Sequence, residues 1–464
     1  MKFLLLLIYT ISLSALEKPN VLFIAVDDLR PDLGCYGVEH VKTPHMDKLG
    51  NEGTVFLNAY CNVPVCGASR ASIMTSIRPI AGKRFMSHMS QADKDAPGIK
   101  TLHALFKENG YTTISNGKIL HMKEDSEAGW SEKPWHDIEY SRQNWASTNF
   151  DALWKLPASK QNLSPRGRGP YREAADVPDS EHQDGKVADK TISDLKKLKE
   201  SGKPFFLACG FWRPHLPFNA PKKYFDMYDK NKLPGPADPI AVKNLPGGCK
   251  SSGELNAYSE VKGRLGSKEF EREARWSYYA CVSYVDAQIG RVLNELKNLG
   301  LDKNTIVVLW GDHGYHLGEH KFWGKHNTLD YSTRVPLILR VPGLGNGQKL
   351  SQLAEFVDIY PTLCELAGLE LPAHVQGESL TAVMKNPSLS GKNAVFIEWR
   401  NCYTIKTRQY AFTQFFNKKG DSESMLFDHI SDRGETENIA DRADMKEVIE
   451  GLKSTLEKHR KGIQ

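Results

Sequence analysis

The chain has 464 residues, enough for one large domain with a smaller appendage or for three domains of ordinary size. Hydrophobic residues make up 40% and charged residues 25% of the sequence, a composition typical of a globular enzyme that excludes the fibrous and disordered classes. The formal net charge of +5 is small for this length, and no dense run of lysine or arginine is present, so nucleic acid is not an expected partner.

The first residues of the chain have the composition of a secretory signal. One lysine precedes an apolar run from Phe3 to Leu13, with small residues near its end where a signal peptidase cleaves. A buried first strand is the alternative interpretation. The run is too short to span a membrane, and no other segment reaches the ~20 apolar residues that a transmembrane helix needs. We therefore expect residues 1–16 to be a signal peptide, the protein to be exported to the periplasm or the extracellular space, and no stable membrane insertion.

Four nearly continuous apolar runs predict buried strands of a sheet. In chain order they are PNVLFIAVDD, KPFFLACGFWRPH, TIVVLWGDHG and VPLILRVPG. Helical spacing of apolar residues predicts helices between and after them, at 69–77, 101–109, 187–200, 269–299 and 358–367. This alternation predicts an α/β fold with a large, mainly parallel sheet sandwiched by helices.

The pattern changes near Gly391 to short alternating strands separated by turn residues. This pattern predicts a smaller antiparallel sheet, followed by an amphipathic helix over 443–458. We therefore expect a large domain over 17–390 and a C-terminal subdomain over 391–464. The segment 123–177, rich in proline, glycine, tryptophan and charge, is expected to be irregular surface structure.

Two of the predicted strands end in side chains that bind cations. Asp27 and Asp28 end the first strand, and Asp312 and His313 end the third. Because functional groups collect beyond the carboxyl ends of parallel strands, we expect these four side chains at one edge of the sheet. Three carboxylates in one place are costly unless a cation neutralises them, and oxygen ligands favour calcium or magnesium over zinc. The alternative is that each aspartate only forms a cap or a turn.

The segment NVPVCGASRASIMTSIRP places Cys66 just before a predicted helix, with Arg70 in its first turn. Backbone N–H groups and the helix dipole favour an anion at this position, and a thiolate there would be activated. Three interpretations are open: half of a disulfide, a buried structural thiol, or a nucleophile. The eight cysteines show no CxxC pair and no zinc spacing, so a disulfide framework is not indicated.

The stretch CGASR followed by ASIMTSIRP resembles the signature of the type I sulfatases, C-x-[PA]-[ST]-R leading into a helix, within the alkaline-phosphatase-like superfamily. The similarity extends over nearly the whole chain after the signal and includes PNVLFIAVDDLRPDLGCYG, TIVVLWGDHGYHLGEH and LFDHISDRGETENIA. The stretches FWRPHLPF, SYVDAQIGRVL and GEHKFWGKHNTLDYSTRVPLI are most similar to the iduronate-2-sulfatase branch and its bacterial relatives. Ala68 stands where most eukaryotic members have proline, which leaves open which maturation enzyme acts.

The resemblance implies an enzyme that hydrolyses sulfate monoesters on a sulfated poly- or oligosaccharide. In the family, the cysteine matching Cys66 is oxidised by a formylglycine-generating enzyme, and the hydrated aldehyde of the formylglycine supplies the attacking hydroxyl. The residues matching the ligands of one calcium ion are Asp27, Asp28, Asp312 and His313, and the modified residue 66 also reaches the metal.

The resemblance assigns roles to five further residues. Arg70 matches the arginine that steadies the formylglycine diol, and Lys118 and His121 of GKILH match its hydrogen-bonding partners. His215 of RPH and Lys325 of WGKH match the pair that holds the sulfate and assists departure of the leaving oxygen. It implies that the cations stabilise the transferring sulfate, that His215 is the acid, and that His121 removes the proton from the second hydroxyl.

Guanidinium groups that bind carboxylates or sulfates, and aromatic rings that stack on sugars, are candidates for a substrate rim: Arg84, His88, Trp212, Arg213, Trp399, Arg400 and Asn401. Ordinary surface arginines and packed tryptophans are equally consistent with the sequence. Two other classes of protein stay open as alternatives. One is a phosphatase or phosphonate hydrolase of the same superfamily, and the other is a non-catalytic glycan-binding relative.

Overall fold

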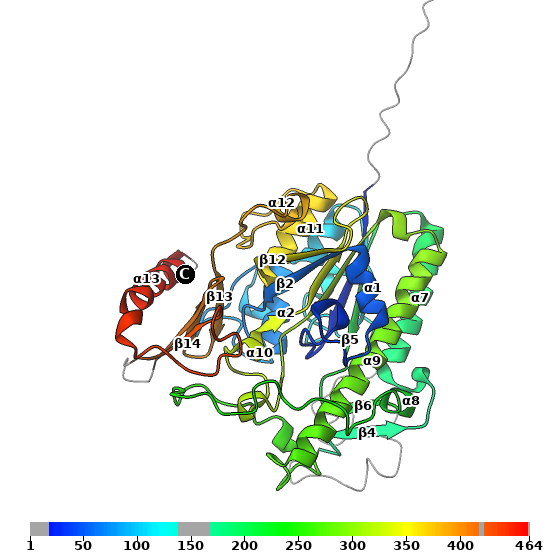
Figure 1. Ribbon diagram of the computed structural model, residues 1–464. Helices are drawn as coiled ribbons and strands as arrows, with labels where there is room; N and C mark the ends of the chain where they lie inside the picture. Colours follow the sequence, from blue (N-terminus) through cyan, green and yellow to red (C-terminus); the bar gives the residue numbers. More distant parts are fainter. Residues whose placement is uncertain (1–17, 138–167, 417–421, 463–464) are drawn as a thin grey trace, which may run out of the picture.

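The structure is a computed structural model that describes residues 18–137, 168–416 and 422–462 (Figure 1). The expected signal peptide and most of the segment 123–177 lie outside the described residues. Within those three ranges, no helix has both the length and the apolar character that crossing a membrane requires.

A large sheet forms the centre of the molecule. Its strands lie in the order β10-β2-β11-β7-β1-β5-β3, and β12 pairs with β2. Strands β7, β1, β5 and β3 are parallel, whereas β11 and β10 run antiparallel to their neighbours. Every residue of the three central strands is buried, as the apolar runs predict. The bounds are β1 Asn20–Val26, β2 Thr54–Tyr60, β3 Thr112–Gly117, β5 Phe205–Phe211, β7 Thr305–Gly311, β10 Arg334–Val335, β11 Leu337–Arg340 and β12 Gln348–Glu355.

Helices cover both faces of this sheet (Figure 1). Alternate residues of β1 point to opposite faces. Leu22 and Ile24 pack with side chains from α1, α7 and α9, whereas Val21 and Phe23 pack with side chains from α2, α4, α11 and α12. The mainly parallel sheet sandwiched by helices is therefore confirmed. The helix bounds are α1 Pro44–Glu52, α2 Cys66–Thr75, α4 Leu102–Glu108, α7 Gln183–Ser201, α9 Lys268–Asn298, α11 Ile359–Ala367 and α12 Thr381–Lys385.

Short elements connect these layers and line their edges. Two small sheets pair β4 with β6 and β8 with β9. The bounds of the short strands and helices are α3 Ala92–Asp95, β4 Arg172–Ala175, β6 Phe218–Pro221, α8 Lys222–Phe225, β8 His316–Leu317, β9 Trp323–Gly324 and α10 Asp330–Thr333.

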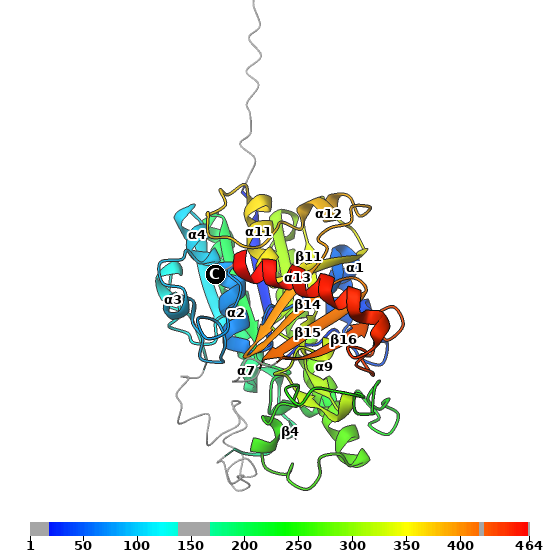
Figure 2. The same cartoon turned by 90° about the vertical axis from the view of Figure 1, so that its left-hand side faces the viewer.

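A four-stranded antiparallel sheet follows, made of β13 Val395–Trp399, β14 Cys402–Lys406, β15 Tyr410–Phe416 and β16 Ser422–Asp428. The last helix, α13 Lys446–Gly462, crosses the strands of this sheet (Figure 2). Side chains of α13 and of the sheet share one apolar cluster. The expected smaller antiparallel sheet with a terminal helix is confirmed, and the division of the chain at 390 stays a prediction.

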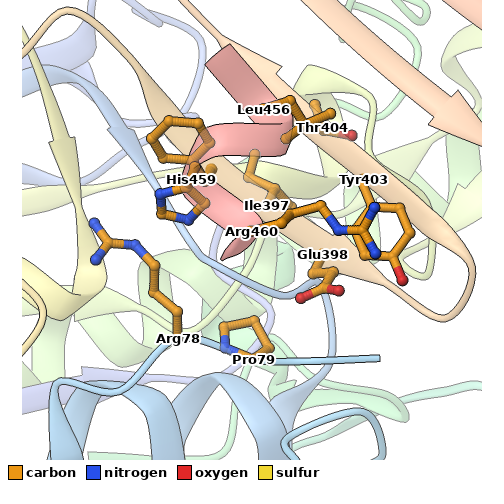
Figure 3. A pocket seen from close by; sticks show the side chains of 10 residues that line it. Arg78, Pro79, Ile397, Glu398, Tyr403, Thr404, Leu456, His459 and Arg460 are labelled. Atoms are coloured by element: carbon orange, nitrogen blue, oxygen red, sulfur yellow. The ribbon is translucent and has the colours of Figure 1, made fainter. Parts of the chain in front are cut away.

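The C-terminal end of α13 packs where the small sheet meets the chain that follows α2 (Figure 3). The ring of His459 stacks on Phe396 with centroids 3.5 Å apart, and the guanidinium of Arg460 lies 3.5 Å from the centre of the Tyr403 ring. Arg78 forms an ion pair of 2.5 Å with Glu355 at the end of β12. The C-terminal subdomain is thereby attached to the segment that leaves α2.

Candidate active site

The carboxyl ends of β1 and β7 lie side by side. Val26 is paired with Gly311, so the side chains that follow each strand meet at one edge of the sheet, as expected. The backbone N–H of Asp28 donates to Oδ1 of Asp312 at 3.0 Å. Asp28 has a φ of +59°, a left-handed conformation that turns the chain sharply at the strand end.

Cys66 and His313 lie against these carboxylates. Nε2 of His313 is 3.1 Å from Sγ of Cys66, 3.3 Å from Oδ1 of Asp28 and 3.6 Å from Oδ1 of Asp312. Nδ1 of His313 donates to the carbonyl of Gly314 at 3.0 Å, so Nε2 presents its lone pair to the group. Burial lowers the pKa of His313 to about 4, which keeps the imidazole in the neutral form that binds metals.

The residues at this edge fit a divalent cation. Ligand atoms of Asp27, Asp28, Cys66 and His313 all lie within 4.8 Å of one another. Burial raises the pKa of Asp28 well above its usual range, and the neighbouring carboxylates add to this effect although Lys325 opposes it. A bound cation would remove the free-energy cost of ionising these carboxylates together. The carboxylates of Asp27 and Asp28, with that of Asp312 beside them, offer the oxygen donors that calcium or magnesium prefers.

Three buried cations surround the same carboxylates. Arg70 donates from Nε to Oδ2 of Asp312 at 2.9 Å, Lys118 pairs with Asp27, and Lys325 Nζ is 2.7 Å from Oδ1 of Asp28. Burial opposes the ionisation of Asp27, but Lys118, His215 and Arg70 hold the pKa of that carboxyl well below its usual range. The arrangement concentrates fixed positive charge next to Cys66, whose Sγ is 3.5 Å from Lys325 Nζ.

Cys66 is the first residue of α2, three residues before the predicted helix start. Burial and the Asp27 carboxylate raise the pKa of its thiol well above the usual value, although Lys325 and Lys118 oppose them. The activated thiolate expected from the helix N-terminus is therefore not favoured. Gly67 is required here because a Cβ at this position would lie 2.2 Å from the carbonyl oxygen of His88.

Lys118 and His121 follow β3, the last strand of the sheet, and approach the site from that side. Arg70 donates from Nη1 to the carbonyl of Ile119 at 3.0 Å and also to that of Lys118, which ties this segment to α2. His121 is buried, and its ring lies edge-on to that of His88, with centroids 6.0 Å apart. Burial and the Lys118 ammonium lower the pKa of His121 well below its usual range.

His215 and Lys325 meet on the other side of the site. His215 follows β5 in the segment RPHLPF, and its Nδ1 donates to the carbonyl of Leu216 at 2.7 Å. Its Nε2 lies 3.9 Å from Oδ2 of Asp28 and 3.4 Å from Oε1 of Glu254. Burial lowers the pKa of His215 to about 3, and Lys325 acts in the same direction.

The family model described as "Sulfatase" matches residues 19–369, which is most of the chain. The chain belongs to the sulfatase family. A second model, for the C-terminal part of N-sulphoglucosamine sulphohydrolase, matches residues 318–462. This protein is a sulfuric ester hydrolase of the alkaline-phosphatase-like superfamily.

Relatives and solved structures agree with this assignment. A sulfatase of Formosa agariphila is 34% identical over 95% of this chain and 87% of its own length, and the iduronate 2-sulfatase of Mus musculus is 35% identical over 77% and 70%. A structure described in complex with its substrate D-glucosamine-2-N,6-O-disulfate has a TM-score of 0.77 at 23% identity, covering 96% of this chain and 98% of that one. The phosphonate monoester hydrolase of Agrobacterium radiobacter has a TM-score of 0.79 at 24% identity, covering 96% of each chain, so both structures support the fold.

Of the predicted rim residues of this sulfatase, three are exposed and one is half-buried, whereas Trp399 is buried with 7% of its surface exposed. Arg84 is half-buried and donates from Nε to the carbonyl of Arg78 at 3.1 Å, and His88 is exposed next to His121. Trp399 stacks on His326 with centroids 5.2 Å apart, and the exposed Arg400 lies over the Trp399 ring at 5.0 Å. Asn401 is also exposed, and its side-chain amide donates to the carbonyl of Phe416.

Trp212 and Arg213 are not at the surface, contrary to the expected rim position. Trp212 is 3% exposed, and Lys118 Nζ lies 4.8 Å from the centre of its ring. Arg213 is 1% exposed and donates from Nη1 to the carbonyl of His215 at 2.8 Å. The chain after β5 turns inward, so these two side chains support Lys118 and His215 from behind.

Sequence reasoning missed Glu254, which reaches the site from the irregular stretch SSGELNAY. Its carboxylate faces both His215 and Lys325, and its side chain is 12% exposed. It also missed His326, which adjoins Lys325 and has a left-handed φ of +78°. No motif or periodicity marks Glu254, and the only signal for His326 is its position next to the lysine of WGKH.

Proposed function

We propose that this sulfatase is an exported enzyme that hydrolyses sulfate monoesters on a sulfated poly- or oligosaccharide, with formylglycine made from Cys66 and one calcium ion. The observation that carries the proposal is the position of Cys66 at the start of α2, between buried carboxylates and the cations Arg70, Lys118 and Lys325.

The fixed charges match the chemistry of a sulfate monoester. Formylglycine, as its hydrate, supplies an attacking hydroxyl and a second hydroxyl through which sulfate can be expelled. Calcium, held by Asp27, Asp28, Asp312, His313 and residue 66, supplies positive charge that stabilises the sulfate oxygens. Arg70, Lys118 and Lys325 would stabilise the charge that develops on sulfate during transfer, because they are buried and already oriented.

Two histidines are placed to move protons. His215 would donate from Nε2 to the leaving sugar oxygen as the imidazolium, with protons on both nitrogens, since its Nδ1 donates to the carbonyl of Leu216; the Glu254 carboxylate, 3.4 Å from Nε2, favours this charged form. His121 lies beside Lys118 on the opposite side and would accept the proton of the second hydroxyl. General acid–base catalysis of this kind contributes about 10²- to 10⁴-fold to the rate.

The proposed substrate is carbohydrate. Relatives are named as an iduronate 2-sulfatase and an ulvan-active sulfatase, and a structural neighbour is described with a glucosamine disulfate. Arg84, His88 and Arg400 are the side chains at or near the surface that would contact the sugar, and the buried Trp399 would support Arg400 from below. Trp212 and Arg213 are no longer proposed as direct contacts because they are buried.

Mass spectrometry of the peptide containing residue 66, together with a desulfation screen over defined sulfated sugars, tests the proposal. We expect formylglycine at residue 66, release of sulfate from at least one uronate or hexosamine sulfate, and a higher kcat/KM on 4-nitrophenyl sulfate than on 4-nitrophenyl phosphate. Cys66→Ala should lose about three orders of magnitude or more in kcat. Cys364→Ala is the matched control, because Cys364 is equally buried but lies in α11.

Dominant phosphatase activity would favour the phosphatase or phosphonate hydrolase of the same superfamily instead. Undiminished desulfation by Cys66→Ala would remove Cys66 from the mechanism, and sugar binding without sulfate release would favour a non-catalytic glycan-binding protein. Export is tested separately by N-terminal sequencing of the secreted protein, which should begin close to residue 17. Co-expression with a formylglycine-generating enzyme should raise the modified fraction at residue 66.

A further inference from the structure

Glu254 is a carboxylate that faces a cation and a histidine proposed to act on an anionic substrate. Its Oε1 lies 3.4 Å from Nε2 of His215, and its Oε2 lies 3.2 Å from Nζ of Lys325. All three side chains are almost completely buried, with exposed fractions of 12% for Glu254, 5% for His215 and 3% for Lys325. A negative charge here opposes sulfate binding by itself, so it requires a separate physical explanation.

Glu254 lies beside the proposed metal ligand Asp28, since ligand atoms of Asp28, His215 and Glu254 all lie within 4.8 Å of one another, and its two partners contact both carboxylates. Lys325 Nζ contacts both Oδ1 of Asp28, at 2.7 Å, and Oε2 of Glu254, at 3.2 Å. His215 Nε2 stands between Oδ2 of Asp28, at 3.9 Å, and Oε1 of Glu254, at 3.4 Å. The carboxylate of Glu254 therefore faces the two groups proposed to hold the sulfate and protonate the leaving oxygen.

Hydrogen bonds join the segment that carries Glu254 to the segment that carries Lys325. Ser252 Oγ accepts from the backbone N–H of Glu254 at 3.3 Å and lies 3.0 Å from Nδ1 of His326. The hydroxyl of Ser251 accepts from the N–H of Trp323 at 3.0 Å and donates to its carbonyl at 3.2 Å.

The two segments also pack closely. A Cβ on Gly324, which has a φ of +76°, would lie 2.9 Å from Cβ of Ser252. Glu254 and Lys325 are consequently held at a fixed separation by their backbones.

Both His215 and Lys325 need such a partner to stay oriented. Nδ1 of His215 donates to the carbonyl of Leu216. The orientation of the ring and the position of Nε2 then depend on the contacts that Nε2 makes on the opposite side. Lys325 has a flexible four-carbon stem, and its contacts other than Glu254, to Asp28 and Cys66, both lie on the side of the proposed metal site, so Glu254 is what holds the ammonium toward His215. A carboxylate that contacts both groups removes this freedom before substrate arrives.

We propose that Glu254 is a positioning residue of the sulfatase reaction, which holds Nε2 of His215 and Nζ of Lys325 in the orientation needed to protonate and release the leaving oxygen. The inference rests on the proposed function. In the step concerned, the attacking hydroxyl oxygen bonds to sulfur while the bond between sulfur and the bridging oxygen breaks and its electron pair stays on the bridging oxygen. The imidazolium form of His215 gives its Nε2 proton to that oxygen and becomes the neutral ring that keeps its proton on Nδ1. Glu254 itself touches neither sulfur nor the leaving group.

The test compares Glu254→Gln with the wild-type protein on aryl sulfates whose phenols leave with increasing difficulty: 4-nitrophenyl, 3-nitrophenyl, phenyl and 4-methylphenyl sulfate. A 4-nitrophenolate departs with little help from an acid, whereas 4-methylphenolate depends on a proton. We expect kcat to fall on every substrate, and the loss to be about tenfold or more larger on 4-methylphenyl than on 4-nitrophenyl sulfate. Glu254→Asp keeps the charge and should recover part of the rate on 4-methylphenyl sulfate.

A loss of equal size on all four sulfates, or no loss, would overturn the inference and leave the proposed function intact. If the wild-type protein releases sulfate neither from these four esters nor from the sulfated sugars of the desulfation screen, the proposed function fails and the inference fails with it. Thermal unfolding of each variant measures folding, and Glu254→Asp carries the same comparison if Glu254→Gln unfolds. Glu269→Gln, in the exposed first turn of α9, is the matched control and should keep the wild-type rates and their dependence on the phenol.

Discussion

At the residue scale, the site is built from charges that are removed from water and satisfied by one another. Arg70 is the clearest case, since its guanidinium contacts Oδ2 of Asp312 at 2.9 Å, Oδ1 of Asp27 at 3.4 Å, and the carbonyls of Lys118 and Ile119. A planar group with five N–H donors can contact all four at once, whereas an ammonium is a point charge with three rotatable donors. The identity of this residue therefore matters beyond its charge.

We expect Arg70→Lys to lower kcat on 4-nitrophenyl sulfate by about a hundredfold or more, because the charge is no longer oriented toward the reacting group. The free energy of unfolding should also fall by about 1–3 kcal/mol, since buried acceptors lose their donors. Steady-state kinetics and urea unfolding measure the two effects. Arg442→Lys replaces an exposed arginine paired with Asp444 and should change neither quantity appreciably. A near-normal kcat in Arg70→Lys would show that orientation at residue 70 is unimportant.

Residues at strand ends could be placed from the sequence, and residues on irregular segments could not. The proximity of Asp28 and Asp312 follows from two apolar runs, because parallel strands bring their carboxyl ends to one edge. Glu254 depends on how a stretch without periodicity folds back over the sheet, and this requires tertiary contacts. Trp212 and Arg213 were expected at the rim because nothing in FWRPH indicates that the chain turns inward.

At the element scale, the helices and strands that were predicted match the structure to within a few residues, whereas β2, β3, β12 and α1 were not predicted. The errors at the helix starts have local causes. Helix α2 begins at Cys66 rather than at the expected residue 69. Its N-cap is Val65, whose side chain cannot cap a helix, so no capping residue marks this start in the sequence. The last helix begins at Lys446 because Ala443–Met445 form a 3₁₀ turn before it. The antiparallel direction of β11 was not predicted, since an apolar run does not encode the direction of a strand.

The packing of α13 on the small sheet depends on a few apolar contacts. Leu456 is 3% exposed and shares a cluster with Ile405, Phe412 and Leu426 of the sheet. We expect Leu456→Ala to lower the free energy of opening α13 by about 2–3 kcal/mol, through lost burial and the cavity left behind. Hydrogen exchange of the α13 amides measures this energy. Lys458→Ala, on the exposed face of the same helix, is the control and should leave the exchange rates almost unchanged.

The same helix should loosen in acid. Burial lowers the pKa of His459 from its ordinary value of 6.5 to about 4, with Arg78 acting in the same direction, while the ring stacks on Phe396. Between these two values the open form binds more protons than the packed form, so the packing contribution is present above pH 6.5 and is lost as pH falls toward 4. His459→Phe keeps the stacking and removes the titration. We expect its α13 amides to show a smaller increase in opening over this interval than the wild-type protein, and an identical pH dependence would contradict the assignment.

At the scale of the whole molecule, the site joins parts of the chain that are far apart in sequence. Asp27 follows β1, Cys66 begins α2, Lys118 follows β3, and Asp312 follows β7, so the sheet and a helix on one of its faces build the site together. A cation bound to these groups would act as a cross-link between the sheet and α2. Its binding should therefore stabilise the whole fold as well as the reacting group.

Removal of the metal is the prediction that follows. We expect a chelator to abolish hydrolysis of 4-nitrophenyl sulfate and to lower the temperature of unfolding, and added calcium to restore both. A hundredfold excess of calcium over its dissociation constant should stabilise the fold by about 2.7 kcal/mol.

Asp312→Asn should weaken this stabilisation because one of the carboxylates facing His313 loses its charge, whereas Asp444→Asn, on the surface, should not. Magnesium should stabilise less, because it demands a stricter octahedral geometry than His313 and three neighbouring carboxylates provide. An unfolding temperature unchanged by calcium would mean that Arg70, Lys118 and Lys325 alone neutralise the carboxylates, and that the reaction proceeds with the charges of the chain itself.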